Sequence, residues 1–436
     1  MAKVNIFWFR RDLRLHDNTG LFHALRSGLP VVPVFIFDRH ILDQLEDRDD
    51  RRVNFIHKAL LELQAQLIKL NSTLDVRYGD PLSIFKELQQ NYEVHAVFTN
   101  HDYEPYAINR DQSVCSWLQQ NNIEFHSYKD QVIFEKNEVM KDNGEPYAVY
   151  TPYSKKWLSL LKDEYLTEWK TEKYFSHFFQ QQQKPLPGLE EIGFTLHDFH
   201  HQAIVDFDRI HSYHLTRDIP SIHGTSRVGV DLRFGTISIR QLVKDALEWN
   251  KTFLGELIWR EFFMQILWHR PDLIHHCFKK EYEAIQWRNQ EDEFEKWCLG
   301  LTGYPLVDAG MRELNATGFM HNRVRMVTAS FLVKDLLIDW RWGDAYFARK
   351  LLDYELASNN GNWQWVAGCG CDAAPYFRIF NPVEQAKKFD PQLIYIKKWI
   401  PELETLHYPL PMVDHKQARE RCLQVYKSAL RDSRRV

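Results

Sequence analysis

The stretch that decides the fold at the start of the chain is "VNIFWFRRDLRLHDN", residues 4–18. The run Val4–Phe9 is apolar and β-rich, and two arginines follow it directly. Such a run is typical of a buried strand in a parallel sheet. A dinucleotide-binding sheet would place G-x-G-x-x-G after this strand, and the chain has no such motif there. The residues after the strand are therefore either a ligand site or a scaffold with surface arginines.

Three similar runs follow the first, at Val31–Phe37, Leu74–Tyr78 and Val94–Thr99. Helix-like segments separate them, among them "DRRVNFIHKALLELQAQLIKLN", residues 50–71. Buried parallel strands that alternate with amphipathic helices predict a doubly wound α/β domain. We expect this domain to span residues 1–130.

The rest of the chain changes character. Residues 131–199 carry turn signals, the glutamine run Gln180–Gln183 and "KPLPG", which favour a surface connector. Beyond them strand patterns vanish and helical periodicity dominates, so residues 200–436 are predicted to be an all-α domain. A length of 436 residues fits two domains better than one core.

Composition excludes several classes of protein. The net charge of −4 argues against a protein that is basic all over, although a local basic face stays open. The six cysteines form no disulfide pattern, and Cys369 and Cys371 lack the second pair that a zinc site needs. The first residues resemble no signal peptide, and no segment is long enough to cross a membrane. We expect a cytoplasmic protein without a metal.

Three helical segments carry polar residues in apolar company. In "FLGELIWREFFMQILWHR", Glu256, Trp259 and Arg260 share one helix face, either as a site or as a core tryptophan beside a solvated ion pair. Asn322, Arg325 and Met326 repeat the spacing in "MHNRVRMVTASFLVKDLL". That segment also reads as a capped helix start with surface arginines.

The third segment is "SNNGNWQWVAGCGCD", residues 358–372. Asn359, Asn360 and Gly361 suit a helix C-terminus, because these residue types tolerate the left-handed conformation. Trp363 and Trp365 follow, and core packing is the simplest reading of each.

A loop upstream has a composition that suits phosphate. Thr225, Ser226 and Arg227 stand where a loop enters a predicted helix. Hydroxyls and free backbone N–H groups at such a point bind anions, and an ordinary Ser or Thr helix cap is the alternative.

Taken together, these segments resemble the photolyase/cryptochrome family. The resemblance rests on "FWFRRDLRLHDN", "GTSRVG…FGTIS", "ELIWREFF", "TGYPLVDAGMRELNATGFMHNRVRM" and "SNNGNWQWVAG…DAAPYFRIFNP", and it covers nearly the whole chain. It implies an α/β antenna domain and a helical domain that holds FAD in a folded conformation. The family's enzymes use light to split lesions in DNA.

The resemblance is strongest to the class I photolyases that act on cyclobutane pyrimidine dimers. It implies a lesion pocket lined by Glu256, Trp259, Asn322, Met326 and Trp365. Six-four photolyases have histidines near two of these positions, and DASH cryptochromes, which favour single strands, have a tyrosine at position 365. Plant-type cryptochromes lose the asparagine found here at Asn359, and signalling cryptochromes usually add a long tail after the "WIPEL" segment. A blue-light photoreceptor and a DASH-like flavoprotein remain the alternatives.

The family chemistry fits these residue types. A dimer must be flipped out of the duplex to reach a buried flavin, and Trp259 and Trp365 would stack on its rings, with about 1–3 kcal/mol for each stacked base. Glu256 would hydrogen-bond the dimer and stabilise the charge that arrives with an electron. Asn359 would face flavin N5.

The resemblance assigns the remaining roles residue by residue. The residues implied to hold FAD are Tyr213, Thr225, Ser226, Arg227, Val228, Gly229, Phe253, Arg325, Asp353, Tyr354, Glu355 and Asn359. Those implied to contact DNA are Arg217, Glu256, Trp259, Arg260, Asn322, Arg323 and Gln385. An electron relay would run through Trp363, Trp340 and Trp287. The expected partner is DNA with a flipped-out dimer, and the expected state is a monomer.

The chain departs from the family pattern at several positions. Gly229 replaces a serine, Phe253 replaces a tryptophan seen in some relatives, and Glu355 stands where aspartate is frequent. A second chromophore is the least determined feature. Glu104 matches a folate-binding glutamate, but Cys277 is followed by Phe278 where such relatives have lysine.

The N-terminal arginines Arg10, Arg11, Arg51 and Arg52 leave open a second alternative beside folate, the phosphate of a flavin or deazaflavin. An empty cleft is the third alternative. We expect any second chromophore to be loosely held.

Overall fold

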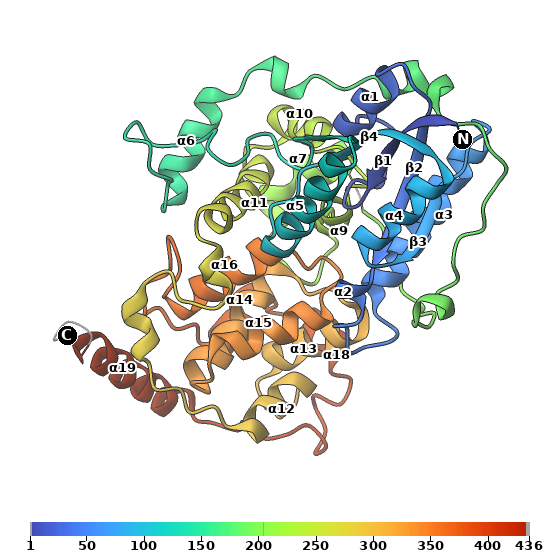
Figure 1. The fold of residues 1–436 in the computed structure, drawn as a ribbon. Helices are drawn as coiled ribbons and strands as arrows, with labels where there is room; N and C mark the ends of the chain where they lie inside the picture. The colour runs from blue at the N-terminus through green and yellow to red at the C-terminus, as the bar shows by residue number, and fades with distance from the viewer. Residues whose placement is uncertain (1, 204, 433–436) are drawn as a thin grey trace. The chain divides into compact units, whose positions relative to one another are not determined.

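A five-stranded, fully parallel sheet forms the centre of the N-terminal region in the computed structural model, which describes residues 2–203 and 205–432. The strand order is β3-β2-β1-β4-β5 (Figure 1). From β1 the chain adds strands first on one side of the sheet, as β2 and β3, and then on the other side, as β4 and β5. The strands are β1 (Lys3–Phe9), β2 (Val31–Asp38), β3 (Asp75–Gly79), β4 (Glu93–Asn100) and β5 (Glu124–Tyr128). The predicted doubly wound α/β fold is confirmed.

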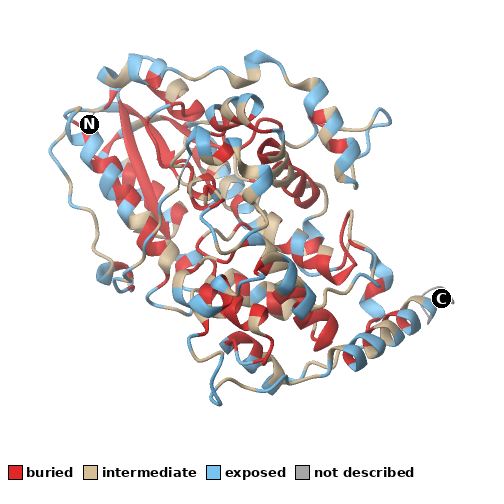
Figure 2. Ribbon diagram, turned by 180° about the vertical axis from the view of Figure 1, so that it is seen from behind, coloured by how far each residue is buried: buried red, intermediate tan, exposed pale blue. Residues whose placement is uncertain are grey.

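The sequence predicted four of these strands to within a residue or two and missed β5. This strand reads "EFHSY" and has no buried residue, because it pairs on one side only, at the edge of the sheet. By contrast, β2 is buried along its whole length and β1 in all but its first residue. An apolar run in the sequence therefore identifies the central strands but not the edge strand β5. The central strands are coloured as buried in Figure 2.

The helices of this region begin where the sequence supplies a side-chain cap. Asn18 caps the first helix, Asp50 the third and Asp80 the fourth, each accepting a hydrogen bond from a backbone N–H in the first turn. The helices are α1 (Thr19–Arg26), α2 (Arg39–Leu42), α3 (Arg51–Ile68), α4 (Pro81–Asn91), α5 (Pro105–Gln120), α9 (Gly229–Phe234) and α10 (Ile239–Trp249), with 3₁₀ turns at Asp163–Leu166, Thr171–His177 and Glu190–Ile192.

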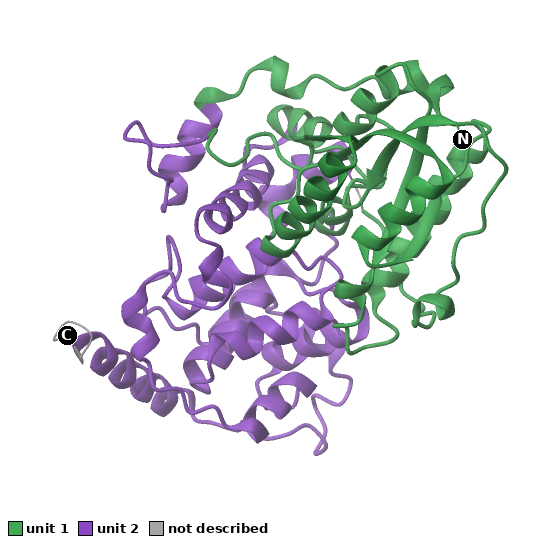
Figure 3. Cartoon of the chain, in the orientation of Figure 1, with its two compact units in different colours: residues 1–138, 159–203, 228–248 green, residues 139–158, 204–227, 249–436 purple. Residues whose placement is uncertain are grey.

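The chain divides into two compact units (Figure 3). One comprises residues 1–138, 159–203 and 228–248, and the other residues 139–158, 204–227 and 249–436. The units are interleaved along the chain, whereas the predicted domains are consecutive stretches divided at residues 130 and 200.

The second unit is helical, as predicted: none of its described residues belongs to a strand of a sheet. Its helices are α6 (Tyr150–Leu160), α7 (Phe207–His211), α8 (Tyr213–Thr216), α11 (Lys251–His269), α12 (Glu291–Leu299), α13 (Pro305–Thr317), α14 (Asn322–Ser330), α15 (Trp340–Lys350), α16 (Leu356–Ala367), α17 (Pro382–Phe389), α18 (Ile394–Trp399) and α19 (His415–Asp432). Short 3₁₀ turns lie at Pro271–Ile274 and Lys280–Ala284, and a π-helical turn at Phe331–Asp335. In the described part of the chain, no helix has the length and apolar character needed to span a bilayer.

Helix α16 packs against α11, α14 and α15 and corrects one prediction. The segment Asn359–Gly361 is not a helix C-terminus but lies inside α16, whose end is capped by Gly368 with a left-handed φ of 90°. Position 361 has a packing reason to be glycine. A Cβ there would lie 2.2 Å from Cδ1 of Phe263, so the missing side chain lets α16 approach α11.

Candidate functional site

A cavity of about 420 Å³ lies in the helical unit, bounded by α11, α14, α15, α16 and the residue that follows α8. It brings together thirteen of the residues predicted to form the site: Arg217, Glu256, Trp259, Arg260, Asn322, Arg325, Met326, Asp353, Tyr354, Glu355, Asn359, Trp363 and Trp365. Residues that the sequence did not single out complete the wall: Phe263, Ala329, Phe347, Leu351, Ser358, Asn362 and Val366. Cavities of this size accommodate ligands much larger than water.

Glu256 is held at the cavity wall by an arginine. Its carboxylate accepts a hydrogen bond from Nη1 of Arg217, and both side chains are about one-third exposed, at 33% and 27%. Burial raises the pKa of Glu256 above its ordinary value, while the positive charge and hydrogen bond of Arg217 lower it in part. The net effect is a pKa above the ordinary value, because burial outweighs the contact with Arg217. Arg217 also lies 5.6 Å from the ring centroid of Tyr213.

Trp259 is held in place by a tyrosine that no sequence pattern indicated. The ring of Tyr150 stacks on Trp259 with centroids 3.7 Å apart and an angle of 5° between the planes. The Tyr150 hydroxyl donates to the backbone oxygen of Gly255 at 2.8 Å, which ties α6 to α11. Such support holds the indole plane in one orientation. Trp365 has the guanidinium of Arg378 5.6 Å from its ring centroid.

Asn359 lines the cavity through α16 and is backed by a carboxyl group. Its Nδ2 donates to the backbone oxygen of Asp344 at 3.1 Å and to Oδ1 of the same residue at 2.5 Å. Burial raises the pKa of Asp344 to about 7, and the hydrogen bond from Asn359 lowers it in part. Asp344 lies on α15, fifteen residues before its partner, and no sequence pattern indicated it.

An ion pair beside Asn359 provides the test of whether a flavin fits. Arg325 donates from Nη2 to Oδ2 of Asp353 at 2.8 Å and from Nε to the Met320 oxygen at 2.7 Å. The other carboxylate oxygen of Asp353, Oδ1, is buried and has no hydrogen-bond partner among the described residues. Buried polar atoms normally have partners. A cavity with aromatic walls and an unsatisfied acceptor suits a flat ring system with N–H donors on its edge, so these residues fit FAD.

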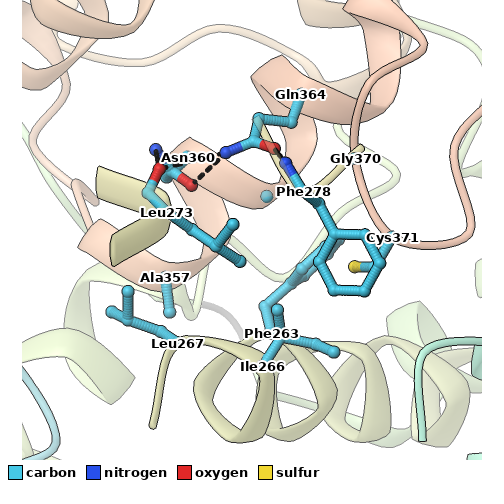
Figure 4. A pocket seen from close by; sticks show the side chains of 11 residues that line it. Phe263, Ile266, Leu267, Leu273, Phe278, Ala357, Asn360, Gln364, Gly370 and Cys371 are labelled. Atoms are coloured by element: carbon cyan, nitrogen blue, oxygen red, sulfur yellow. Dashed lines mark hydrogen bonds between the residues drawn. The ribbon is translucent and has the colours of Figure 1, made fainter. Parts of the chain in front are cut away.

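The far side of α16 is anchored separately. Asn360 and Gln364 both donate to the backbone oxygen of Leu273 at 3.0 Å, and Gln364 also donates to Asn360 at 3.1 Å. Gln364 accepts from the backbone N–H of Phe278 at 2.9 Å. A small apolar cavity of about 10 Å³ lies beside them, next to Phe263 and Cys371 (Figure 4). These bonds fix the rotation of the helix, and hence which side chains face the larger cavity.

Of the three tryptophans of the predicted relay, only Trp363 lines the cavity. Its ring lies 5.0 Å from Phe347 and 6.2 Å from Trp297, and it packs directly on Gly343, where a Cβ would be 2.1 Å from Cη2. Trp340 is fully buried at the start of α15, and Trp287 is partly buried. Within the described residues, no direct ring contact joins Trp363 to Trp340, and Trp297 was not predicted.

The predicted phosphate loop is irregular and tightly folded. Thr216 Oγ1 donates to the Gly224 oxygen at 3.0 Å, and a Cβ at position 224 would clash with Thr216 at 2.5 Å. Ser226 is buried, and Arg227 has a left-handed φ of 56°. The N-cap position of α9 is Val228, not a hydroxyl residue, and Gly229 is the first helical residue. An ordinary Ser or Thr cap therefore does not explain the loop.

Further predicted residues lie outside the cavity wall. Phe253 is buried on α11, edge-on to Tyr213 at 5.3 Å. Gln385 lies on α17, and Arg323, next to Asn322, forms an ion pair with Asp218. Of the seven residues predicted to contact DNA, Arg323 and Gln385 do not line the cavity, and the other five do.

Glu104, the predicted antenna residue, is already bound by arginines. It accepts from Arg11 Nη1 at 3.0 Å and from Arg233 Nη1 at 2.5 Å. Arg10 donates to Asp111. These side chains are thus paired with one another inside the first unit. No group of three or more His, Cys, Asp or Glu side chains in the described ranges is placed to hold a metal ion.

Comparison with known proteins agrees with this geometry. Residues 5–172 match the family model for DNA photolyase, and residues 253–407 match that for the FAD binding domain of DNA photolyase. A deoxyribodipyrimidine photo-lyase of Vibrio cholerae is 36% identical over 98% of this chain and 100% of its own.

Solved structures agree as well. A class III photolyase from Agrobacterium tumefaciens has a TM-score of 0.86 at 31% identity, covering 98% of each chain. An archaeal photolyase from Sulfolobus tokodaii with two FAD molecules has 0.78 at 34%, covering 98% of this chain and 100% of its own. A Synechocystis cryptochrome has 0.86 at 26%, covering 98% and 99%. With family models across both regions and full-length relatives above 30% identity, the chain belongs to the DNA photolyase family.

Proposed function

We infer that this protein is a deoxyribodipyrimidine photolyase, which uses light and FAD to split cyclobutane pyrimidine dimers in DNA. The observation that carries the inference is the single cavity in which the five predicted lesion residues meet the residues that fit a flavin. The family match and the relatives of the same name support it.

The walls of the cavity suit a flipped-out dimer. Trp259 and Trp365 offer two indole surfaces, and Trp259 is stiffened by the stacked ring of Tyr150. Glu256 stands at the same wall with a raised pKa, so it can offer a neutral carboxyl group to a dimer carbonyl. Such a donor stabilises negative charge as it develops on the lesion. A distorted lesion is easier to flip than an intact base pair, which favours damaged sites.

The other end of the cavity would hold the flavin. In its reduced form, FAD supplies the electron after it absorbs light. Asp353 would accept a hydrogen bond from the ring edge, while Arg325 holds this carboxylate in place. Asn359 would contact N5, and Asp344 fixes the orientation of its amide. Because the pKa of Asp344 is about 7, this carboxyl group can hold a proton at neutral pH.

Two further parts of the proposal concern the state of the protein. We expect a monomer, since one cavity contains all the lesion residues and needs none from a second copy. All six cysteines are unbonded, as is usual in the reducing cytoplasm, where we place the protein.

The deciding experiment measures repair directly. Purified, reduced protein is illuminated with blue light in the presence of duplex DNA that contains thymine dimers, and restored thymines are counted, with a dark sample as the control. Repair of the duplex is expected. Repair confined to single strands would support a DASH-like activity, and light-induced absorbance changes without repair would support a photoreceptor.

Arg323→Ala is expected to reduce the salt dependence of lesion binding. A phosphate contact releases counterions, so the slope of log K against log[salt] should become shallower by about one unit. Binding curves at several salt concentrations measure it. Arg270→Ala is the matched control, because Arg270 also forms an ion pair, with Asp272, but is not among the residues predicted to contact DNA. A slope equal to that of the wild type would place Arg323 away from the DNA backbone.

FAD is expected to be the sole chromophore retained at full stoichiometry through purification. The ion pairs around Glu104 leave no open carboxylate for a second one. Denaturing the protein and separating the released chromophores checks this, with absorbance spectra as the readout. A second chromophore recovered at one per protein would mean that a tight antenna site exists and that these ion pairs rearrange.

A further inference from the structure

Two neighbouring residues, Arg217 and Asp218, each form an ion pair with a residue of a different helix. Arg217 is the basic partner in its pair, and Asp218 is the acidic partner in the other. Arg217 donates to Glu256 on α11, while Asp218 accepts from Arg323 on α14, with Oδ1 2.8 Å from Nη2 and 3.3 Å from Nε. Each of the two arginines proposed to contact the DNA backbone at this point is therefore paired with an acidic side chain of the protein itself. Glu256 has a role in the cavity, but Asp218 does not line it and has none so far.

The surroundings of Arg323 show how it is held. Its guanidinium carbon lies 4.4 Å from the ring centroid of Phe389 on α17, and its side chain is only 16% exposed. The side chain of Asp218 is 42% exposed. The aromatic ring keeps the arginine in place, and the carboxylate is the more accessible partner.

A carboxylate and a phosphate bind an arginine in the same way. Both present oxygen pairs that match the planar guanidinium fork. Ion pairs open to solvent contribute about 0.2–1 kcal/mol. Here the carboxylate of Asp218 is the partner open to solvent, at 42% exposure, so another anion can exchange with it. A DNA phosphate can therefore replace Asp218 on Arg323 without moving the arginine from Phe389.

We propose that Asp218 competes with the DNA backbone for Arg323 and so sets how fast undamaged or repaired DNA leaves the protein. The proposal rests on the proposed function, because it requires DNA at this face. Binding to undamaged DNA is almost wholly electrostatic, so one internal competitor weakens it directly. Without this competitor the repaired duplex stays bound for longer, and release of product delays the next cycle.

The test compares Asp218→Asn with the wild type on undamaged and dimer-containing duplexes. The matched control is Asp272→Asn, because Asp272 pairs with Arg270 at 2.7 Å and is also 42% exposed. Asp218→Asn is expected to bind both duplexes up to about fivefold more tightly, with a salt slope steeper by as much as about 0.9. Dissociation of the repaired duplex should slow by a similar factor, whereas Asp272→Asn should behave as the wild type does.

A second comparison separates competition from support of the fold. In an Arg323→Ala background, Asp218→Asn should change affinity and slope much less than it does with Arg323 present, because the group competed for is gone and only general repulsion of the phosphates remains. Weaker DNA binding by Asp218→Asn, or an unchanged slope, would overturn the proposal and make Asp218 an orienting partner of Arg323. Asp218→Ala repeats the test with a smaller side chain, and FAD content verifies that each variant is folded. If the wild type neither binds nor repairs dimer DNA, the proposed function itself fails.

Discussion

Trp363→Phe is expected to stop most light-driven reduction of protein that is purified with oxidised FAD. Trp363 is the one tryptophan of the predicted relay that lines the cavity, so it is the proposed first donor. Phenylalanine is far harder to oxidise than tryptophan. It keeps most of the apolar volume against Phe347 and Gly343, so the fold and FAD binding should survive. Absorbance of the flavin during illumination measures the effect.

Trp297 provides the comparison for this experiment. It is fully buried, its ring lies 6.2 Å from that of Trp363, and its Nε1 donates to the Thr328 oxygen at 3.1 Å. If the relay continues through Trp340, the flavin in Trp297→Phe should be reduced at nearly the rate of the wild type, and the flavin in Trp340→Phe should be reduced more slowly. The reverse result would place the second donor at Trp297. Rapid reduction in Trp363→Phe itself would show that another residue is the first donor.

Glu256→Ala is expected to lower repair per absorbed photon several-fold while FAD stays bound. A hydrogen bond to a charged group contributes about 1.5–3 kcal/mol, and the variant loses this contact with the charged dimer. Burial raises the pKa of Glu256, so the carboxyl group is protonated up to a higher pH than an exposed glutamate. Repair by the wild type should therefore decline as pH rises through this raised pKa, because the donor proton is lost.

The control for this prediction is Glu256→Gln. Its amide donates at every pH, so its yield should vary less with pH than that of the wild type. Yields are measured with dimer DNA at saturating concentration, which removes differences in affinity. A yield in Glu256→Ala equal to that of the wild type would exclude the proposed role.

The sequence predicted the structure best at positions where a residue type has a single physical explanation, such as burial in a strand or capping of a helix. The buried strands β1 and β2 are continuous apolar runs, and Asp50 precedes a helix that it caps. The spacing of Glu256, Trp259 and Arg260 correctly placed all three on one wall of the cavity.

Residues whose reason lies elsewhere in the chain were misread or missed. Gly361 looked like the end of a helix because its actual reason, the ring of Phe263, is almost a hundred residues away. Tyr150 and Asp344 were missed because their partners, Trp259 and Asn359, are adjacent only after folding. The sequence predicted a DNA contact for Arg323, and its ion pair with Asp218 was missed because nothing in the sequence links the two residues. Long-range partnership, not residue type, was the missing information.

The contact between Gly361 and Phe263 constrains the order in which mutations can accumulate in this lineage. Even a methyl group at position 361 would meet the ring at 2.2 Å and 2.5 Å, so it is accommodated only after the ring has been replaced by a smaller side chain. A smaller residue at 263 leaves a gap but no clash, so that change can come first. A variant with a side chain at position 361 therefore has to carry a smaller residue at position 263 first. In a library that randomises both positions, folded variants that lack Gly361 should also lack Phe263.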